Sequence, residues 1–236
     1  MVAGMSTPAA ARPMPTRQRL LWSALATVLA PVQGRSVLDC GGGSGSLAVP
    51  MAELGAEVTV VDVSVDALAT LTRRSSEAGV SERIHPVQGD IESLADAVGS
   101  TTFDLVMAHE LLESVDDVTG AFDSLASAVR PGGRLSIVVA NPVAAVLSRV
   151  VANDFAAARA LLKAPATGQL MLSGVEALCA MSGLSVDSAQ GIGVFTEFAG
   201  SDDAEGVLAE LEELASMRSP YRDIAARVHV VARRAG

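Results

Sequence analysis

Two aspartates, a cluster of glycines and one histidine are the residues of this chain best placed to do chemistry. Asp39 ends a short apolar run, and glycines follow at once at positions 41, 42, 43 and 45. A second apolar run, 58–61, ends in Asp62. Glycine lets a backbone approach a ligand closely and adopt positive φ, and a carboxylate at such a strand end can accept the hydroxyls of a ribose. The combination predicts a nucleotide-binding site.

The elements that must position these residues follow from the hydrophobic pattern. The run 36–38 predicts a first strand, the amphipathic segment 47–54 a helix, and 58–61 a second strand. A strand, a glycine turn, a helix and a strand make the βαβ unit of a doubly wound α/β sheet. The helix behind the turn would offer unpaired N–H groups to the ligand.

The spacing of the glycines indicates the class of nucleotide. The dinucleotide pattern G-x-G-x-x-G fails, because its last position, counted from Gly41, falls on Ser46. The spacing present is D-x-G-x-G-x-G, from Asp39 through Gly41 and Gly43 to Gly45. It resembles motif I of the class I S-adenosylmethionine (AdoMet) methyltransferases. A nicotinamide or flavin enzyme and a glycine turn that binds no ligand are the alternatives.

Composition favours a single acidic domain. A chain of 236 residues with 50% hydrophobic content can bury one full core, and a net charge of −10 argues against broad binding to nucleic acid. Two cysteines without C-x-x-C spacing indicate neither a disulfide framework nor a zinc site, so no metal is expected. The most apolar window, 20–32, is too short to span a bilayer, and we expect a cytoplasmic protein without a membrane partner.

The rest of the chain alternates between helical and extended patterns. Further helices are expected over 17–29, 65–77 with Ser64 as its N-cap, 116–129, 173–182 with a capping box, and 202–217 as a solvated acidic helix. Further strands are expected over 83–88, 103–107, 135–139, 184–194 and 226–233, the last antiparallel beside the one before it.

The expected domain organisation is a tail followed by one domain that contains an insertion. Residues 1–15 are rich in alanine, proline and threonine and are predicted to be a disordered tail. Residues 16–236 form one domain, in which 142–172 is a helical insertion that we expect to act as a lid over the active site. The insertion carries Arg149, Arg159 and Lys163, which fit either an anionic acceptor or an ordinary solvated helix face.

Two residues just beyond strand ends complete the predicted site, since ligands of open α/β sheets lie outside the carboxyl ends of the strands. His109 follows the strand 103–107 and should project toward the reacting atoms, either as a base or as part of the wall. Asp90 follows the strand 83–88, where turn chemistry is its alternative role. His85 and His229 are expected to serve packing or the surface.

Later motifs extend the resemblance to the class I methyltransferases. Arg130 begins an R-P-G-G sequence before a β-branched strand, a second feature typical of that family. Nearly all of the chain after residue 15 is similar to one branch, associated with methyl-esterifying 5-carboxymethoxyuridine at the tRNA wobble position. The segments that carry this similarity are 17–22, 37–45, 151–155, 191–195 and 219–234.

The resemblance implies a seven-stranded Rossmann-like sheet, AdoMet as cofactor, and a role for several residues. Arg17 would contact the methionine carboxylate, Asp62 the ribose and Asp90 the adenine amino group, while His109 would line the methyl-transfer site. The full set of expected cofactor-binding residues is Arg17, Asp39, Gly41, Gly42, Gly43, Gly45, Asp62, Val63, Gly89, Asp90, Ile91 and His109.

The methyl acceptor stays open between two classes. The tRNA-modifying branch carries a cluster of lysines, arginines and tyrosine after 151–155, whereas this chain reads KAPATGQLMLS over 163–173 and keeps only Lys163. Such charges engage the phosphates of a nucleic acid, so the partner is either tRNA or an anionic small molecule. An O- or N-methyltransferase of metabolites and a catalytically silent AdoMet-binding protein are the alternatives, and the sequence leaves the oligomeric state open.

Overall fold

One seven-stranded sheet organises the part of the chain that the computed structural model describes, residues 16–163, 170–196 and 205–236. The expected disordered tail, 1–15, lies outside it. The strands are β1 (Ser36–Cys40), β2 (Glu57–Asp62), β3 (Ile84–Gln88), β4 (Phe103–His109), β5 (Val129–Ala140), β6 (Leu184–Ile192) and β7 (Arg227–Arg234). Their spatial order is β3-β2-β1-β4-β5-β7-β6, and β7 alone among these strands runs antiparallel, between β5 and β6. The predicted Rossmann-like sheet is confirmed.

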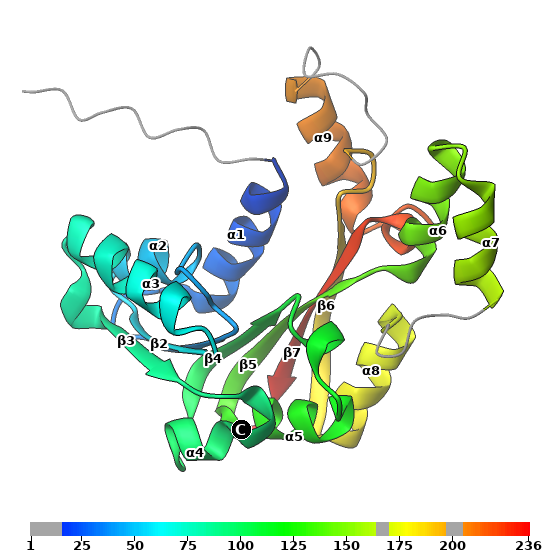
Figure 1. The fold of residues 1–236 in the computed structure, drawn as a ribbon. Coiled ribbons are helices and arrows are strands. Elements are labelled where there is room, and N and C mark those ends of the chain that lie inside the picture. The colour runs from blue at the N-terminus through cyan, green and yellow to red at the C-terminus, as the bar shows by residue number, and fades with distance from the viewer. Residues whose placement is uncertain (1–15, 164–169, 197–204) are drawn as a thin grey trace, which may run out of the picture.

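Helices cover both faces of the sheet. They are α1 (Thr16–Leu29), α2 (Ala48–Glu53), α3 (Val65–Glu77), α4 (Leu94–Val98), α5 (Val118–Ala128), α6 (Pro142–Val151), α7 (Phe155–Lys163), α8 (Leu172–Met181) and α9 (Glu205–Ser216). Figure 1 shows α1, α2 and α3 on one face and α4, α5 and α8 on the other. Ser64 caps α3 as predicted, because its side chain accepts a hydrogen bond from the N–H of Ala67.

The alternation of side chains along the central strands divides the core into two layers. Leu105 and Met107 of β4 pack with α1, α2 and α3, whereas Val106 and Ala108 pack with α4, α5 and α8. All four side chains are fully buried. A strand that is buried on both faces reads as a continuous apolar run, which is why the sequence identified these strands.

Most predicted boundaries differ from the structure by one or two residues, and those at the starts of β5 and α8 are wrong for a physical reason. β5 begins at Val129 rather than at 135, because Val129 already pairs with Phe103 and the R-P-G-G residues form a bulge within the strand. α8 begins at Leu172, before Ser173, and its N-cap, Met171, makes no capping hydrogen bond through its side chain. The predicted capping box is therefore absent, and the burial of the apolar face of α8 stabilises the helix instead.

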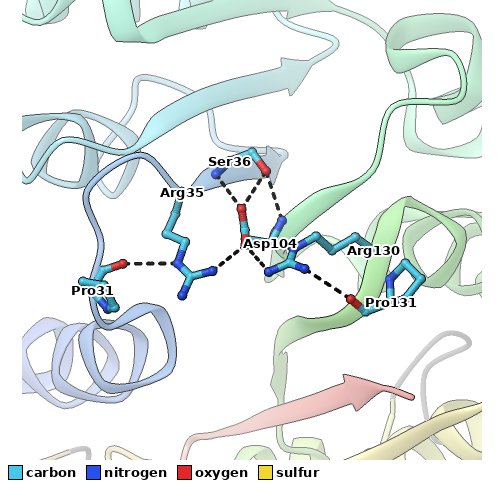
Figure 2. Close-up of polar contacts among 6 residues, drawn as sticks. All are labelled: Pro31, Arg35, Ser36, Asp104, Arg130 and Pro131. Carbon is cyan, nitrogen blue, oxygen red and sulfur yellow. Dashed lines mark hydrogen bonds and ion pairs between the residues drawn. The ribbon is translucent and has the colours of Figure 1, made fainter. Parts of the chain in front are cut away.

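An ion-pair network ties together the amino ends of β1, β4 and β5 (Figure 2). The carboxylate of Asp104 accepts hydrogen bonds from Arg35 at 2.8 Å, from Arg130 at 2.6 and 2.8 Å, and from the backbone N–H and hydroxyl of Ser36 at 3.0 Å. Burial alone would raise the pKa of Asp104, but these donors lower it to about 2. The network lies at the sheet edge opposite the carboxyl ends of the parallel strands.

The acidic helix α9 is attached to the sheet by a buried carboxylate. Glu212 is fully buried and accepts hydrogen bonds at 2.8–2.9 Å from the backbone N–H groups of Val194, Phe195 and Thr196, just after β6. The expectation that the acidic residues of this helix are solvated is wrong for Glu212, while Asp202 and Asp203 lie outside the described residues. Glu212 fixes the loop that follows β6.

A helical hairpin, α6 and α7, follows β5 where the expected insertion begins (Figure 1). Asn141 caps α6 by accepting a hydrogen bond from Val143, and its amide donates to the carbonyls of Asp223 and Ala225 before β7. The hairpin is therefore anchored at the carboxyl end of β5. Among the described helices, none is long and apolar enough to cross a membrane.

Candidate cofactor and acceptor site

Two cavities open at the carboxyl ends of the parallel strands and share one residue, Gly41. The first, here called the Asp62 cavity, has a volume of about 280 Å³ and is lined by Cys40, Gly41, Val61, Asp62, Val63, Gly89, Asp90, Ile91, Glu92, Leu111, Ser114 and Val115. The second, here called the His109 cavity, measures about 420 Å³ and is lined by Leu21, Asp39, Gly41, Gly42, Ser46, Leu47, His109, Glu110, Val138, Ile192 and Arg227. An elongated ligand could extend from one into the other past Gly41.

The glycine turn is shaped by contacts that exclude larger residues. Gly41 has a φ of +68°, in the left-handed region, and its N–H donates to the carbonyl of Val61 at 2.8 Å. A Cβ atom on Gly42 would lie 2.5 Å from the carboxylate of Asp39. The turn therefore lies directly against Asp39, and both glycines present bare backbone to the cavities.

Asp62 is oriented by the backbone around it. The N–H of Gly43 donates to one carboxylate oxygen at 2.9 Å, and the N–H of Ser64 donates to the other at 2.8 Å. Each oxygen keeps further capacity to accept a hydrogen bond, as two ribose hydroxyls would require. The carboxylate is thus held at the end of β2 in a fixed orientation.

Asp90 stabilises a turn, which was the alternative to its predicted role in binding adenine. Its side chain accepts a hydrogen bond at 3.0 Å from the N–H of Glu92 and caps the short 3₁₀ helix Ile91–Ser93. It also lines the Asp62 cavity together with Gly89 and Ile91, so the fold brings it near the expected adenine position.

The structure brings most of the predicted cofactor-binding residues together. Asp62, Val63, Gly89, Asp90 and Ile91 line the Asp62 cavity, Asp39, Gly42 and His109 line the His109 cavity, and Gly41 lines both. Gly43 orients Asp62, and Gly45 donates to the carbonyl of Gly42 within the turn. The side chain of Arg17 lies outside the described part of the chain.

Asp39 is a buried carboxylate without a hydrogen bond from any described residue. Its side chain is 4% exposed. Burial, with a smaller contribution from the charge of Asp62, raises the pKa of Asp39 to about 7. The group therefore titrates near neutral pH, and a cationic ligand in the cavity would favour its charged form.

His109 is the first of four side chains that are hydrogen-bonded in a row across the sheet. Its Nε2 lies 2.8 Å from the hydroxyl of Ser136, which lies 2.9 Å from Nε2 of His229. Nδ1 of His229 lies 3.0 Å from the amide nitrogen of Gln190. Burial, and then the proximity of His229, lowers the pKa of His109 to about 3, and burial lowers that of His229 to about 4.

The predicted role of His229 in packing or at the surface is incomplete. His229 is 1% exposed, but its ring also connects His109 to Gln190 through hydrogen bonds. The sequence contained a signal for this, because His229 alternates with apolar residues along β7 and therefore shares a face with Arg227.

An ion pair in the His109 cavity was missed by the sequence analysis. Nε of Arg227 lies 2.7 Å from a carboxylate oxygen of Glu110, and the Arg227 side chain is 21% exposed. Glu110 has a φ of +54°, which is uncommon for a residue other than glycine. The pair places a guanidinium beside His109 on the wall of the cavity.

Known proteins share the glycine turn and the sheet of this chain. A family model described as a methyltransferase domain matches residues 38–137, from the glycine turn to β5. The fold is similar to that of magnesium protoporphyrin IX methyltransferase from Synechocystis PCC 6803 with bound SAH, with a TM-score of 0.63 and 18% identity over 93% of this chain and 84% of that one. It is also similar to an AdoMet-dependent methyltransferase from Mesorhizobium loti, with a TM-score of 0.61 and 22% identity over 90% and 97% of the two chains. The protein is an AdoMet-dependent methyltransferase with the class I fold.

Two curated relatives show how far the similarity of this methyltransferase extends. The tRNA 5-carboxymethoxyuridine methyltransferase of Escherichia coli K12 is 29% identical over 92% of this chain and 88% of its own length. The ubiquinone biosynthesis O-methyltransferase of Methylocella silvestris is 40% identical, but over only 44% of this chain and 39% of its own length. The second similarity is therefore confined to a segment shorter than half of either protein.

The residues of this methyltransferase fit the cofactor on structural grounds. A Cβ atom at Gly42 would fill the space against Asp39, Asp62 is already oriented, and Nδ1 of His109 is buried without a hydrogen-bond partner in the described residues. When bound, AdoMet supplies a methyl group on a sulfonium, which is already a good electrophile. The protein must then align the acceptor with that methyl group and exclude water.

Proposed function

We propose that this methyltransferase transfers the methyl group of AdoMet to a carboxylate oxygen of 5-carboxymethoxyuridine in tRNA, forming a methyl ester. The acceptor oxygen attacks the methyl carbon, the carbon–sulfur bond breaks, and the sulfur keeps the electron pair. A carboxylate is ionised at neutral pH, so this reaction needs no general base.

The observation that carries this proposal is the extent of the similarity to the E. coli tRNA enzyme, which covers 92% of this chain. That span includes the carboxyl-terminal half, where α6, α7 and β7 lie. Class I methyltransferases share the cofactor-binding half, so similarity beyond it bears on the acceptor.

The composition of the His109 cavity also supports a carboxylate acceptor. Arg227, which is paired with Glu110, contributes a guanidinium to the cavity wall, and a guanidinium can bind a carboxylate through two hydrogen bonds. His109 is neutral at pH 7, because burial keeps its pKa near 3, and a group of that pKa is a weak base. An acceptor that is already ionised matches this environment better than a hydroxyl that must lose a proton.

We infer the placement of the cofactor and of the lid from the same residues. Asp62 would hold the ribose of AdoMet in the Asp62 cavity, and Asp90 would lie beside the adenine. Gly41 would let the methionine part reach the His109 cavity. We also propose α6 and α7 as the lid, in which Arg149, Arg159 and Lys163 would attract an anionic acceptor.

Two features of the sequence favour a second candidate, an anionic small molecule. The segment after Lys163 lacks the cationic cluster that the resembling tRNA-modifying branch carries, and the chain has a net charge of −10. Both features weaken attraction to the phosphates of a nucleic acid. Methylation of a metabolite carboxylate would use the same cavity without those contacts.

Labelled methyl transfer tests the proposal. The purified protein is incubated with methyl-labelled AdoMet and tRNA that carries 5-carboxymethoxyuridine, and the wobble nucleoside is examined by mass spectrometry. We expect a methyl ester on this tRNA, none on tRNA that lacks the carboxymethoxy group, and a steep loss of activity with added salt. Absence of the ester, while small carboxylic acids are methylated without salt sensitivity, would establish the second candidate instead.

A matched pair of variants assigns the role of Arg227. Arg227→Gln should raise the acceptor KM at least tenfold, while the Kd for S-adenosylhomocysteine changes less than threefold. Glu110→Gln, which removes the partner of Arg227 but keeps the guanidinium, should have the smaller effect on the acceptor KM. If Arg227→Gln weakens S-adenosylhomocysteine instead, Arg227 binds the methionine carboxylate and not the acceptor.

A further inference from the structure

The four hydrogen-bonded side chains at His109 come from four neighbouring strands. His109 lies at the end of β4, Ser136 in β5, His229 in β7 and Gln190 in β6. Gln190 and His229 are directly paired in the register of β6 and β7, so the two rings and the amide share one face of the sheet. The row crosses the half of the sheet that carries the His109 cavity.

The amide of Gln190, at one end of this row, determines which group donates and which accepts in each of its hydrogen bonds. The amide nitrogen of Gln190 lies 3.0 Å from Nδ1 of His229, and an amide nitrogen can only donate. Nδ1 of His229 must then accept, so the proton of this neutral ring is on Nε2. That N–H donates to the oxygen of Ser136, and the hydroxyl proton of Ser136 is left for Nε2 of His109.

The same order of donors and acceptors determines the tautomer of His109. Because Nε2 of His109 accepts from Ser136, the ring proton is on Nδ1, where it is a hydrogen-bond donor. Nδ1 is buried and has no partner among the described residues, although His109 lines the cavity. An unpaired buried donor is unfavourable, and a ligand that accepts a hydrogen bond there would relieve the cost.

We propose that Gln190, His229 and Ser136 are positioning residues that hold His109 as its Nδ1–H tautomer, so that His109 donates a hydrogen bond to the carboxylate of the methyl acceptor. This rests on the proposed function as far as the acceptor is a carboxylate. In this arrangement His109 orients the acceptor and does not remove a proton. Both rings are neutral at pH 7, so a fixed tautomer is chemically meaningful there.

Nitrogen-15 NMR of the ring nitrogens tests the tautomer without any acceptor. We expect the Nδ1–H form for His109 and the Nε2–H form for His229 in the wild-type protein. Gln190→Glu places a carboxylate, which accepts a hydrogen bond, beside His229 and should reverse both tautomers. The proposal is overturned if wild-type His109 carries its proton on Nε2, or if Gln190→Glu leaves both rings unchanged.

Steady-state kinetics then tests the consequence for the acceptor. Gln190→Glu should raise the KM for a carboxylate acceptor at least tenfold, with the Kd for S-adenosylhomocysteine within twofold of wild type. Gln190→Met, which removes the donor without adding an acceptor, should give a smaller increase. A faster reaction in Gln190→Glu would show that His109 works as a base and would overturn its role as a donor.

Two substitutions of His109 itself provide the matched control. The amide nitrogen of asparagine can occupy the place of Nδ1, so His109→Asn should retain much of the acceptor affinity that His109→Ala loses. Circular dichroism and melting temperatures identify any variant that fails to fold. If tRNA is not the acceptor, the NMR result still stands and the kinetics are measured with the small carboxylate that is methylated.

Discussion

At the scale of single residues, burial sets the pKa values of two titratable side chains that line the His109 cavity. Asp39 and His109 line the same cavity, and burial moves their pKa values in opposite directions, to about 7 and about 3. Burial disfavours the charged form of either group. The site of the protein without ligand therefore favours the neutral forms of Asp39 and His109.

The affinity for the cofactor should depend on the ionisation of Asp39. A cationic ligand favours the carboxylate, so the Kd for AdoMet should increase as the pH falls below 7, by up to tenfold per pH unit. Asp39→Asn should weaken binding at pH 8 and remove this pH dependence. Titration calorimetry from pH 5.5 to 8.5 measures both effects, and an unchanged slope in the variant would contradict the assignment.

The same pKa gives a prediction about stability. The folded-state pKa of Asp39 lies above its unfolded value of 3.8, so its contribution to stability is present below pH 4 and is lost as the pH rises toward 7. A shift of roughly three pH units corresponds to at most about 4 kcal/mol. Asp39→Asn should therefore stabilise the ligand-free protein at pH 8, as measured by urea unfolding, and have little effect at pH 4.

At the scale of elements, two carboxylates, the buried Glu212 and the partly buried Asp104, connect segments that are distant in sequence. The carboxylate of Glu212 in α9 accepts hydrogen bonds from three N–H groups after β6, and that of Asp104 in β4 connects the amino ends of β1 and β5. Neither carboxylate lines the two cavities. Their effect on function is therefore indirect, through the position of the strand ends and of Ile192.

Removal of Glu212 should destabilise the protein strongly. Glu212→Ala leaves three backbone donors without a partner, at a cost of roughly 3 kcal/mol or more in the free energy of unfolding. For a chain of this size the melting temperature should fall by roughly 6–12 °C. Glu213→Ala, on the exposed side of the same helix, is the matched control and should change it little. Equal effects of the two substitutions would argue against a special role for Glu212.

Asp104 should make the stability of the protein sensitive to strong acid. Its folded-state pKa of about 2 lies below the unfolded value of 3.8, so the stabilisation is present above pH 4 and is lost as the pH falls toward 2. Allowing for solvent screening of the two arginines, we expect about 1 kcal/mol. Unfolding experiments on Asp104→Asn should show this loss at pH 7, and the difference from wild type should vanish near pH 2.

At the scale of the whole molecule, the charges are distributed unevenly around the site. The chain has a net charge of −10, yet the hairpin of α6 and α7 carries Arg149, Arg159 and Lys163 against Asp154. The hairpin also exposes Val150, Val151, Phe155 and Leu162. It thus presents a mixed cationic and apolar surface.

Charge reversal on this hairpin tests the lid. The double variant Arg159→Glu, Lys163→Glu should raise the KM for tRNA at least tenfold. The slope of the logarithm of activity against the logarithm of salt concentration should become shallower by about two, one for each lost phosphate contact. The Kd for S-adenosylhomocysteine should stay within twofold. Filter-binding and activity assays over a salt series measure this. An unchanged salt slope would mean that the hairpin does not contact the acceptor.

The sequence by itself determined the sheet, and it predicted the residues of the glycine turn and of the Asp62 cavity, which the fold brings together. Parallel strands buried on both faces give continuous apolar runs, and the turn between β1 and α2 needs glycine for its geometry, so both leave a local signature. The segment from Asp39 to Asp62 contains the glycine turn and the acid at the end of β2 within a short stretch. The boundaries of β5 and α8 were wrong because a bulge and apolar packing overrode the local turn and capping signals.

Only the tertiary structure brings together the residues around His109, where we propose that the acceptor binds. Ser136, Gln190, Arg227 and His229 are far from His109 in sequence and have no common motif, and they meet because β7 inserts between β5 and β6. Strand order depends on long-range pairing, which no local pattern encodes. For the same reason the burial that sets the pKa of Asp39 and of His109 exists only after the sheet and its helices have packed.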